Sequence, residues 1–306
     1  MMIIDPYRFG AGGLPYTPPL DANNAAAAYS IRKLRTDYDG ACLRISSENS
    51  GGGTTKDVGF DSNGYLDIAE LYENSYVIIW YDQTGNSNHL DRSSGTNIQP
   101  QLQISSVLNE VNGKAALSFI GSKRMNVPSS TATFKFLHDG TKSSVVSVQQ
   151  FGTSANPNSM MALWGTAIST PQTGGNFFFR DALGANNSLL QQVVRGVNGQ
   201  PAVEWIAPNE SLTPNIQTLI YNEIDPSNAT AEDRYITQEN DGASLKGNTN
   251  TNPPSIANST LDLTIGVLSG SFPLVGFIQE IIFFDTDQSG NKATLQSNIN
   301  DYFTIY

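Results

Sequence analysis

Cysteine and histidine are almost absent from this sequence, which contains one cysteine, Cys42, and two histidines, His89 and His138. A lone cysteine cannot form a disulfide within the chain, so the fold must be stabilised by its core. Cys42 lies in a strand-like run and is expected to be a buried, unreactive thiol. Neither histidine has a second histidine or a cysteine nearby, so we expect no zinc site. A Gly-x-Ser-x-Gly motif and a phosphate-binding loop are also missing, which disfavours the enzymes that use them.

Long apolar runs and clustered positive charges are missing too. No apolar segment approaches 18 residues, so we expect no membrane span, and residues 1–6 do not resemble a secretory signal. The 28 acidic residues outnumber the 17 basic ones and give a formal net charge of −11. Phosphate backbones and anionic membranes repel such a chain. We therefore expect neither nucleic acid nor a membrane as partner. The basic run RKLR at 32–35 is interpreted as the solvated face of a helix.

Polar residues that form turns are abundant instead. The 29 Asn outnumber Lys and Arg together, and only 15% of the residues are charged. A helical protein would be richer in Glu, Lys, Ala and Leu. A chain of 306 residues buries roughly three quarters of its unfolded surface. The composition therefore favours one large β domain with polar loops.

The order of apolar runs and turn residues predicts the domain organisation. Residues 1–20 contain four prolines and are expected to form an extended N-terminal arm, whereas residues 21–306 form one domain. We predict helices at 25–34, 66–73 and 291–302, and strands at 40–46 and 77–81. Further strands are predicted at 115–120, 143–149, 160–164, 176–180, 189–195, 202–206, 216–221, 233–237, 261–267 and 274–284. This spacing predicts an all-β fold, a two-sheet jelly-roll sandwich with a few short helices.

The most informative segment is VIIWYDQTGNSNHL at 77–90. Its first five residues predict a buried strand with Trp80 in the core, and the polar residues that follow predict a turn. Two interpretations of the turn stay open. Its side chains lock the backbone, or they contact a glycan, since planar amides and an aromatic ring suit sugar hydroxyls and C–H faces. The candidate glycan-binding residues are Tyr81, Asp82, Gln83, Asn86, Asn88 and His89.

Calcium is the one metal that the sequence leaves open. Asp82, Asn86, Asn88 and Asp91 place four oxygen-bearing side chains within ten residues, and calcium favours such ligands. The spacing is not that of an EF-hand, and bonds that stabilise the turn are the alternative. We otherwise expect no cofactor.

Several motifs resemble known families. LDLTIG at 261–266 and PLVGFIQEIIFF at 273–284, after an Asp-Gly turn at 241–242, resemble the last strands of concanavalin A-like and laminin-G-like sandwiches. AAAYSIRKLR at 26–35, YDG at 38–40, DVGF at 57–60 and WYDQTGNSNHL at 80–90 resemble, in this order, the sandwich catalytic domain of fungal-type α-L-arabinofuranosidase B. They are even more similar to non-catalytic bacteriophage virion proteins with the same domain. The resemblance covers residues 21–306, and residues 2–10 resemble the start of phage tail or baseplate proteins.

The resemblance also defines what catalysis would require. Retaining glycosidases need two carboxylates about 5–5.5 Å apart. In the resembled enzymes these are a Glu in a Met-Glu-Asn segment and an Asp soon after the Ile-Gly strand. Here VLSG at 267–270 follows Ile265 and Gly266 without a carboxylate. Glu204 is the nearest candidate nucleophile, but it lacks the Met-Glu-Asn context, and a structural strand residue is the alternative for it. We therefore expect no enzyme activity, with an arabinofuranosidase that uses relocated carboxylates as the alternative.

Together these features lead us to expect a structural or adhesion protein of a bacteriophage virion, in the tail, a fibre or the capsid decoration. It would bind host-surface polysaccharide as a homo-oligomer, whose several copies raise avidity. The N-terminal arm would contact other virion proteins. A purely architectural virion module without a ligand is the third hypothesis.

Overall fold

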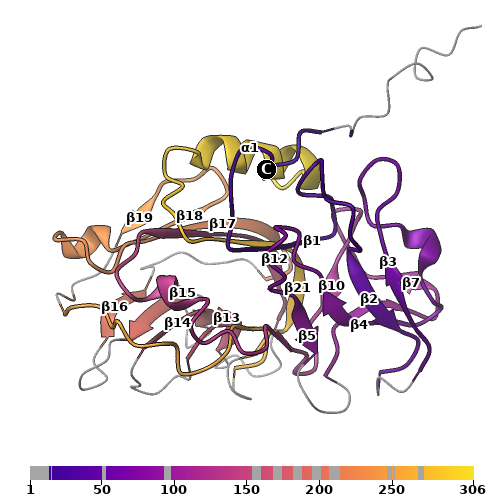
Figure 1. Ribbon diagram of the computed structural model, residues 1–306, viewed down its shortest axis with the longest axis horizontal. Coiled ribbons are helices and arrows are strands. Elements are labelled where there is room, and N and C mark those ends of the chain that lie inside the picture. The colour runs from indigo at the N-terminus through magenta and orange to yellow at the C-terminus, as the bar shows by residue number, and fades with distance from the viewer. Residues whose placement is uncertain are drawn as a thin grey trace, which may run out of the picture.

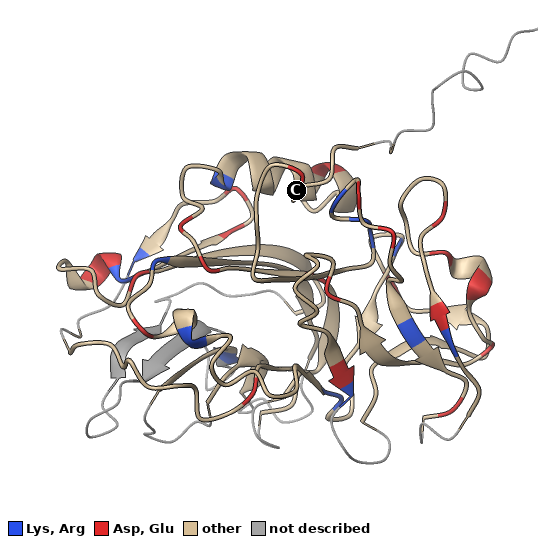
Figure 2. Ribbon diagram, in the orientation of Figure 1, with Lys and Arg blue, Asp and Glu red and all other residues tan. Residues whose placement is uncertain are grey.

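Two antiparallel sheets face each other, and a C-terminal helix lies across the outer face of one of them (Figure 1). The computed structural model describes residues 14, 16–49, 53–92, 98–153, 160–167, 174–181, 188–194, 201–206, 214–246, 250, 252–267 and 272–306. No helix among these residues is long and apolar enough to cross a membrane. Basic and acidic residues are dispersed over the loops, strands and helices of the described chain (Figure 2).

The first sheet is built around two long strands. Its strands in spatial order are β19 (Leu245–Lys246), β18 (Tyr235–Glu239), β17 (Gln217–Ile224), β12 (Ser143–Phe151), β21 (Gly276–Phe284) and β1 (Ala27–Ser30). β21 pairs along its whole length with β12. Its other edge pairs with β10 (Leu117–Ser118) at residues 277–278 and with β1 at residues 280–283. The last strand in the sequence is therefore a central strand of the sheet.

The second sheet faces the first and is joined to it at one end. Its strands in spatial order are β16 (Pro201–Ile206), β15 (Ser188–Val194), β14 (Gly175–Asp181), β13 (Met161–Gly165), β20 (Thr264–Ile265), β11 (Met125–Asn126), β5 (Leu90–Arg92) and β4 (Ser75–Trp80). β4 also pairs with β2 (Leu43–Ser46) and β6 (Gln101–Ile104). β6 pairs with β10, and β10 pairs with β21 of the first sheet, so the two sheets are joined by hydrogen-bonded strands at this end.

Short elements complete the end where the sheets meet. β3 (Thr55–Val58) pairs with β2, and β7 (Val107–Leu108) pairs with β6. β8 (Glu110–Val111) and β9 (Lys114–Ala115) form a separate hairpin. The helical elements are η1 (Ile68–Glu70), η2 (Lys135–Leu137), η4 (Ala231–Asp233) and α1 (Lys292–Phe303).

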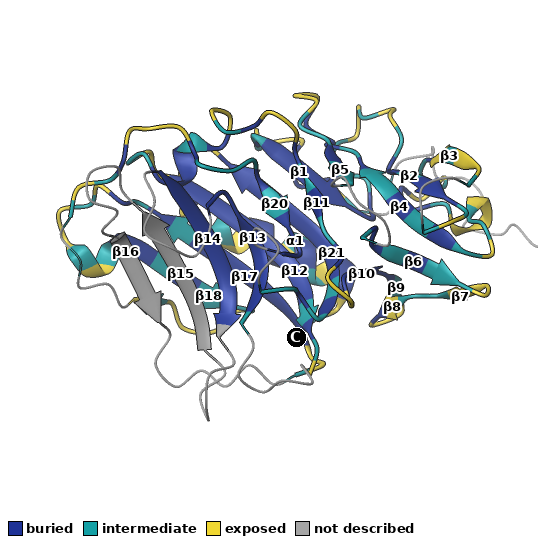
Figure 3. Ribbon diagram, turned by 90° about the horizontal axis from the view of Figure 1, so that it is seen from below, coloured by how far each residue is buried: buried dark blue, intermediate teal, exposed yellow. Residues whose placement is uncertain are grey.

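The core lies between the sheets and is mainly aromatic and β-branched. Phe283 of β21 contacts the rings of Phe134 and Trp164 edge-on, each at 5.7 Å between centroids. Trp164 of β13 also stacks on Phe178 of β14. These contacts identify the inner faces, and the buried colour runs along the middle of both sheets (Figure 3). The predicted all-β two-sheet sandwich with few short helices is confirmed.

Several local predictions are confirmed as well. The predicted helix at 291–302 is α1 (Lys292–Phe303), and the strands predicted at 143–149 and 274–284 are β12 and β21. Trp80 is fully buried, and so is Cys42, whose thiol donates to the Ser30 carbonyl at 3.1 Å. Burial raises the pKa of the Cys42 thiol well above its usual value. The last residue of the strand predicted at 189–195 lies outside the described residues.

The helix predicted at 25–34 is wrong, because residues 27–30 form β1 against β21. A surface helix needs a polar face, but nearly every side chain from Ala25 to Leu34 is buried or half-buried. The solvated basic face predicted at 32–35 is therefore wrong too, since Arg32 is fully buried. The helix predicted at 66–73 is reduced to η1, in which the Asp67 carboxylate accepts from the backbone N–H of Ala69.

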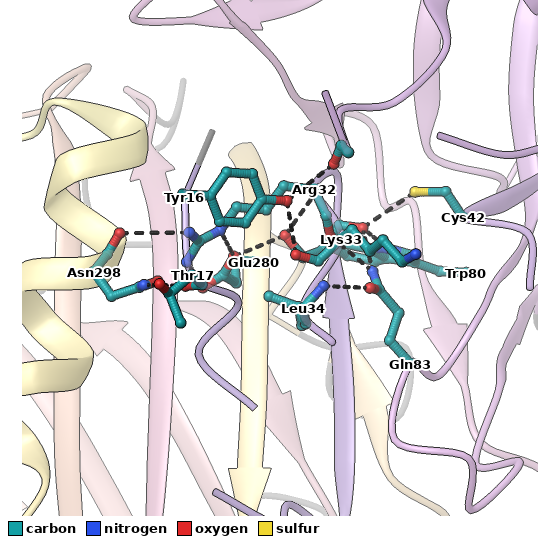
Figure 4. Close-up of polar contacts among 12 residues, drawn as sticks. Tyr16, Thr17, Arg32, Lys33, Leu34, Cys42, Trp80, Gln83, Glu280 and Asn298 are labelled. Carbon is teal, nitrogen blue, oxygen red and sulfur yellow. Dashed lines mark hydrogen bonds and ion pairs between the residues drawn. The ribbon is translucent and has the colours of Figure 1, made fainter. Parts of the chain in front are cut away.

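Arg32 is buried as half of an ion pair with Glu280 of β21 (Figure 4). The Arg32 Nε and Nη2 atoms lie 2.9 and 3.2 Å from the two Glu280 carboxylate oxygens, and the Ser30 hydroxyl donates to the same carboxylate at 2.7 Å. Burial by itself lowers the pKa of Arg32. The charge and hydrogen bonds of Glu280 raise it by more than burial lowers it, so the pKa lies above its usual value. The pair links the segment that follows β1 to β21 within the apolar interior.

Residues of the predicted arm cover this ion pair. Tyr16 places its ring 5.4 Å from the Arg32 guanidinium, and its hydroxyl donates to the carbonyls of Lys33 and Gly64. The side-chain amide of Asn298, in α1, donates to the Thr17 carbonyl at 2.6 Å (Figure 4). Most of the arm, residues 1–13 and 15, lies outside the described residues, so its boundary at residue 20 stays a prediction.

Candidate functional site

The turn after β4 is held by the buried carboxylate of Asp82, which is 1% exposed. Its oxygens accept from the backbone N–H groups of Ala28, Thr84 and Asn88 at 3.0–3.1 Å, and from the Thr84 hydroxyl at 2.8 Å. A carboxylate that accepts several N–H bonds can be buried without being left unpaired. Asp82 therefore holds the turn together through bonds to Thr84 and Asn88 and joins it to β1 through the bond from Ala28.

Gln83 fixes the segment that follows β1. Its side chain is fully buried, with the amide nitrogen donating to the carbonyls of Ser30 and Arg32 and the amide oxygen accepting from the Leu34 N–H. These bonds, at 2.8–3.0 Å, satisfy backbone groups that leave the sheet after Ser30. Asp82 and Gln83 thus make the backbone contacts that the turn-locking interpretation predicts.

Asn86 and Asn88 continue this bracing at the surface. The Asn86 amide nitrogen donates to the carbonyls of Ala25 and Ala26, each at 3.1 Å, and the Asn88 amide nitrogen donates to the Ala26 carbonyl at 2.8 Å. Both amides are therefore oriented with their nitrogen toward the backbone. Asn86 is exposed, whereas Asn88 is half-buried.

Tyr81 and His89 belong to a different surface. The Tyr81 hydroxyl donates to Asp57 of β3 at 2.8 Å, and Arg44 of β2 forms a two-point ion pair with the same carboxylate. Burial, the main cause, and the bond to Asp57, the second cause, raise the pKa of Tyr81 to about 12. The bond from Arg44 lowers the pKa of Asp57. The His89 ring meets Tyr81 edge-on at 5.0 Å and accepts from the Asp82 N–H through Nδ1.

Three of the four calcium candidates already use side-chain atoms in bonds that hold the turn. The Asp82 carboxylate accepts protein donors, and the bonded atoms of Asn86 and Asn88 are nitrogens. Desolvation raises the pKa of Asp91, so its charged form is disfavoured. No group of three His, Cys, Asp or Glu side chains in the described ranges is arranged to hold a metal. Calcium binding stays a prediction that no contact described here tests.

A polar groove of about 280 Å³ lies beside the braced turn. It is lined by residues 20 and 23–26, by Thr84 and Asn86 of the turn, by Arg35, and by Asp285, which directly follows β21. Of the six predicted glycan-binding residues, Asn86 is the one that lines this groove. The bracing of residues 25 and 26 by Asn86 fixes the wall that these residues form.

Two side chains in the groove have no partner in the part of the chain that the structure describes. Asn24 and Asp285 are exposed and form neither a side-chain hydrogen bond nor an ion pair there. Arg35, in contrast, is engaged: it donates to both carboxylate oxygens of Asp37 and to the Thr84 carbonyl. The sequence analysis missed Asn24 and Asp285, because no local pattern brings together residues 261 positions apart in the chain.

Glu204, the candidate nucleophile, lies on β16 opposite Gln192 of β15. Its side chain, and residues 268–270 after the Ile-Gly strand, lie outside what the structure describes. The expectation that this chain does not catalyse glycoside hydrolysis therefore stays a prediction.

The fold is similar to that of solved arabinofuranosidases. An arabinofuranosidase complexed with arabinofuranosyl-α-1,2-xylobiose matches with a TM-score of 0.60 and 12% identity, over 90% of this chain. A GH54 α-L-arabinofuranosidase soaked with a cyclic sulfate inhibitor matches with a TM-score of 0.58 and 13% identity over the same share. A mutant of that enzyme type, soaked with 4-nitrophenyl α-L-arabinofuranoside, gives 0.61 and 14%. No family model and no curated protein matches the chain.

At this identity the likeness establishes the fold and nothing more. It confirms the predicted sandwich, for which the motifs at 26–35 and 80–90 resemble this family and those at 261–284 resemble concanavalin A-like and laminin-G-like sandwiches. The matched region spans 62% of the length of each of these enzymes' chains.

Proposed function

We propose that this protein is a non-catalytic carbohydrate-binding sandwich and that the groove beside Asn86 holds the sugar. The observation that carries the proposal is the pair of unpartnered polar groups, Asn24 and Asp285, next to an amide whose orientation is fixed. Amide and carboxylate groups are suited to sugar hydroxyls, which both donate and accept. A site on a braced turn loses little freedom when a ligand binds.

The carboxylate content of the groove supports binding over hydrolysis. Asp285 is the one carboxylate among its described lining residues, whereas two-step glycoside hydrolysis needs two. A lone carboxylate can hold a hydroxyl by a charge-assisted hydrogen bond, but it cannot serve as nucleophile and acid in turn.

Two other hollows are less suited to a sugar. One is lined by Lys142, Asp225, Asp233 and Lys246, which form ion pairs with one another at 3.5 and 2.5 Å. The other, of about 180 Å³, is bordered by Tyr65 and Tyr302, but the Lys114 ammonium lies within 5.0 Å of both rings. In both, the groups that would recognise a ligand already contact each other.

The proposed place of the protein is a bacteriophage particle, in the tail, a fibre or the decoration of the capsid. The support is the similarity of residues 26–35 and 80–90 to virion proteins and of residues 2–10 to tail-associated ones. Several copies per particle would convert a weak single site into useful avidity. Mass spectrometry of the purified parent particle tests this directly, and absence of the protein from the particle rejects it.

A glycan array with the full chain tests the binding function. We expect bound glycans, and we expect Asn24→Ala and Asp285→Ala each to weaken binding about tenfold, the loss of one good hydrogen bond. Asp287→Asn, an exposed change two residues beyond the groove, is the control that keeps binding. A blank array with a folded protein that assembles into particles contradicts the proposal and favours the architectural hypothesis.

The hydrolase alternative needs its own assay. Incubation with an aryl α-L-arabinofuranoside and bacterial polysaccharides is expected to yield no product. Turnover that Glu204→Gln abolishes would overturn the non-catalytic assignment.

A further inference from the structure

The groove offers more hydrogen-bond acceptors than donors. The Asn86 nitrogen is used by the carbonyls of Ala25 and Ala26, so the amide oxygen is the group left for a ligand. The amide nitrogen of Asn23 donates to the Pro19 carbonyl at 2.9 Å, and its amide oxygen accepts from Asn291. Asp285 adds a carboxylate, which accepts only. Asn24 is the remaining unpartnered side chain that can both donate and accept.

The positive charge in the groove, on Arg35, is already paired with the carboxylate of Asp37. Nε and Nη2 of Arg35 donate to the two carboxylate oxygens of Asp37 at 2.9 and 2.8 Å, and Nη1 donates to the Thr84 carbonyl at 2.8 Å. This two-point geometry fixes the plane of the guanidinium and holds it beside an opposite charge.

The negative charge of Asp285, in contrast, has no cation within ion-pair distance among the described residues. Asp285 also directly follows the last residue of a long central strand, Phe284, which is fully buried. The carboxylate is therefore carried by a rigid element and cannot retreat far from a bound ligand.

We infer that the groove selects uncharged sugars with neighbouring hydroxyl groups and rejects acidic sugars such as uronic acids. This inference rests on the proposed function and names the ligand class of the same site. Hydroxyl groups supply the donors that Asp285 and the Asn86 oxygen require. A sugar carboxylate held in the groove would come close to Asp285 without a free cation beside it. For two like charges roughly 5 Å apart, the Coulomb repulsion weakens affinity by roughly fivefold to a hundredfold, depending on the local dielectric.

Matched sugar pairs test the inference by saturation-transfer NMR and calorimetric titration. The probes are methyl galactoside against methyl galacturonide and methyl glucoside against methyl glucuronide, with the full chain at low salt. We expect the uncharged member of a bound pair to bind at least about fivefold more tightly. The difference is expected to shrink in high salt, because screening weakens repulsion between exposed charges.

Asp285→Asn is the decisive variant, because it removes the charge and keeps the shape. It is expected to reduce the discrimination against the acidic sugar to about twofold or less, whereas Asp287→Asn preserves the discrimination. Equal or tighter binding of the acidic sugars, or unchanged discrimination in Asp285→Asn, overturns the inference while the binding function stands. Absence of binding to every sugar, charged and uncharged, overturns the proposed function and the inference with it.

Discussion

Single side chains with buried charges are where this fold is most sensitive. Asp82, Arg32 and Glu280 are at most 1% exposed, yet each has several polar partners. Removing one partner of such a set leaves the others unpaired in a low-dielectric interior, which costs more than the original bond contributed. Exposed pairs such as Arg44–Asp57 are screened by water and contribute little.

Asp82→Ala is expected to lower the free energy of unfolding by about 2–4 kcal/mol, because the N–H groups of Ala28, Thr84 and Asn88 lose their acceptor. Urea denaturation followed by tryptophan fluorescence measures the change. Asp285→Ala, at an exposed carboxylate without a partner, is expected to stay within about 0.5 kcal/mol of the unmodified chain. Equal effects of the two variants would contradict the bracing role of Asp82.

Glu280→Gln is expected to cost about 3–5 kcal/mol, since it leaves the Arg32 guanidinium buried without an opposite charge. The exposed counterpart, Asp57→Asn, is expected to cost less than about 1 kcal/mol. Replacing Arg32 and Glu280 together by methionine is expected to recover part of the loss. A double variant that is less stable than Glu280→Gln would show that the two effects do not couple as a buried pair does.

His138 gives the stability a pH dependence with a definite sign. The ring is fully buried and contacts the Ala257 carbonyl through Nε2 at 2.9 Å, and burial lowers its pKa below the usual value near 6.5. The unfolded chain therefore binds this proton more readily than the folded chain does. Above the pKa of the unfolded chain, His138 contributes its full share of stability. As the pH falls from that pKa to the lower pKa of the folded chain, this contribution is lost by up to roughly 1.4 kcal/mol per pH unit.

Urea unfolding between pH 5 and 8 compares the full chain with His138→Gln. The difference in unfolding free energy between the two is expected to shrink as the pH falls below about 6.5. His89→Gln controls for the loss of a histidine as such. A difference that is constant across the range would show that His138 does not titrate differently in the folded chain.

Strands with a strong local pattern are predictable from the sequence, whereas elements defined by distant partners are not. β12 and β21 are continuous β-branched and aromatic runs. β1 is alanine-rich and has a helical propensity, but it lies in the sheet because β21 pairs with it from about 250 residues away. Residues 25–34 include Ser30, Arg32 and Lys33, so their sequence does not argue against a helix; the burial of the segment in the structure does.

The candidate site divides in the same way. The turn itself follows from the local sequence of residues 82–88, since Asp82 and Thr84 accept from backbone N–H groups two to six residues further on. The bonds of Gln83, Asn86 and Asn88 to residues 25–34 do not follow from it, because their partners lie 49–62 positions away in the sequence. The groove does not follow from it either, because Asp285 reaches the groove only through the register of β21 against β1, in which Phe283 lies opposite Ala27. Local patterns hold no information about that register.

At the scale of an element, the pairing of β12 with β21 depends on a glycine. A methyl group at Gly276 would lie 2.1 Å from the Gln150 carbonyl oxygen, a contact with backbone that a side-chain shift cannot relieve. Gly276→Ala is expected to destabilise the chain by about 2 kcal/mol or more. Gly59→Ala, where the methyl group meets nothing within 4 Å, is the control and is expected to be neutral or slightly stabilising. Similar thermal midpoints for both variants would contradict this account.

For the molecule as a whole, the fold is retained although little of the sequence is shared with the solved enzymes, at 12–14% identity. Cores of this kind tolerate extensive apolar substitution while volume and pattern are kept.

Two truncations separate the base of the arm from the rest of it. Deletion of residues 1–20 is expected to lower the unfolding free energy by about 2–4 kcal/mol, because it removes buried Leu20 and uncovers the Arg32–Glu280 pair. Deletion of residues 1–13 keeps the contacts of Tyr16, Thr17 and Leu20 and is expected to change stability by less than about 0.5 kcal/mol. Calorimetry measures both, and an equal loss in the two truncations would place the important contacts before residue 14.

The central position of β21 has a consequence for synthesis on the ribosome. β1 emerges early, but the strand that pairs with it is translated about 250 residues later, roughly 12–50 s at ordinary elongation rates. During that interval the edges of β1 and β12 that face β21 lack their native strand partner. A nascent chain of this topology must be shielded by chaperones or remain soluble through its acidic charge until its final strand closes the sandwich.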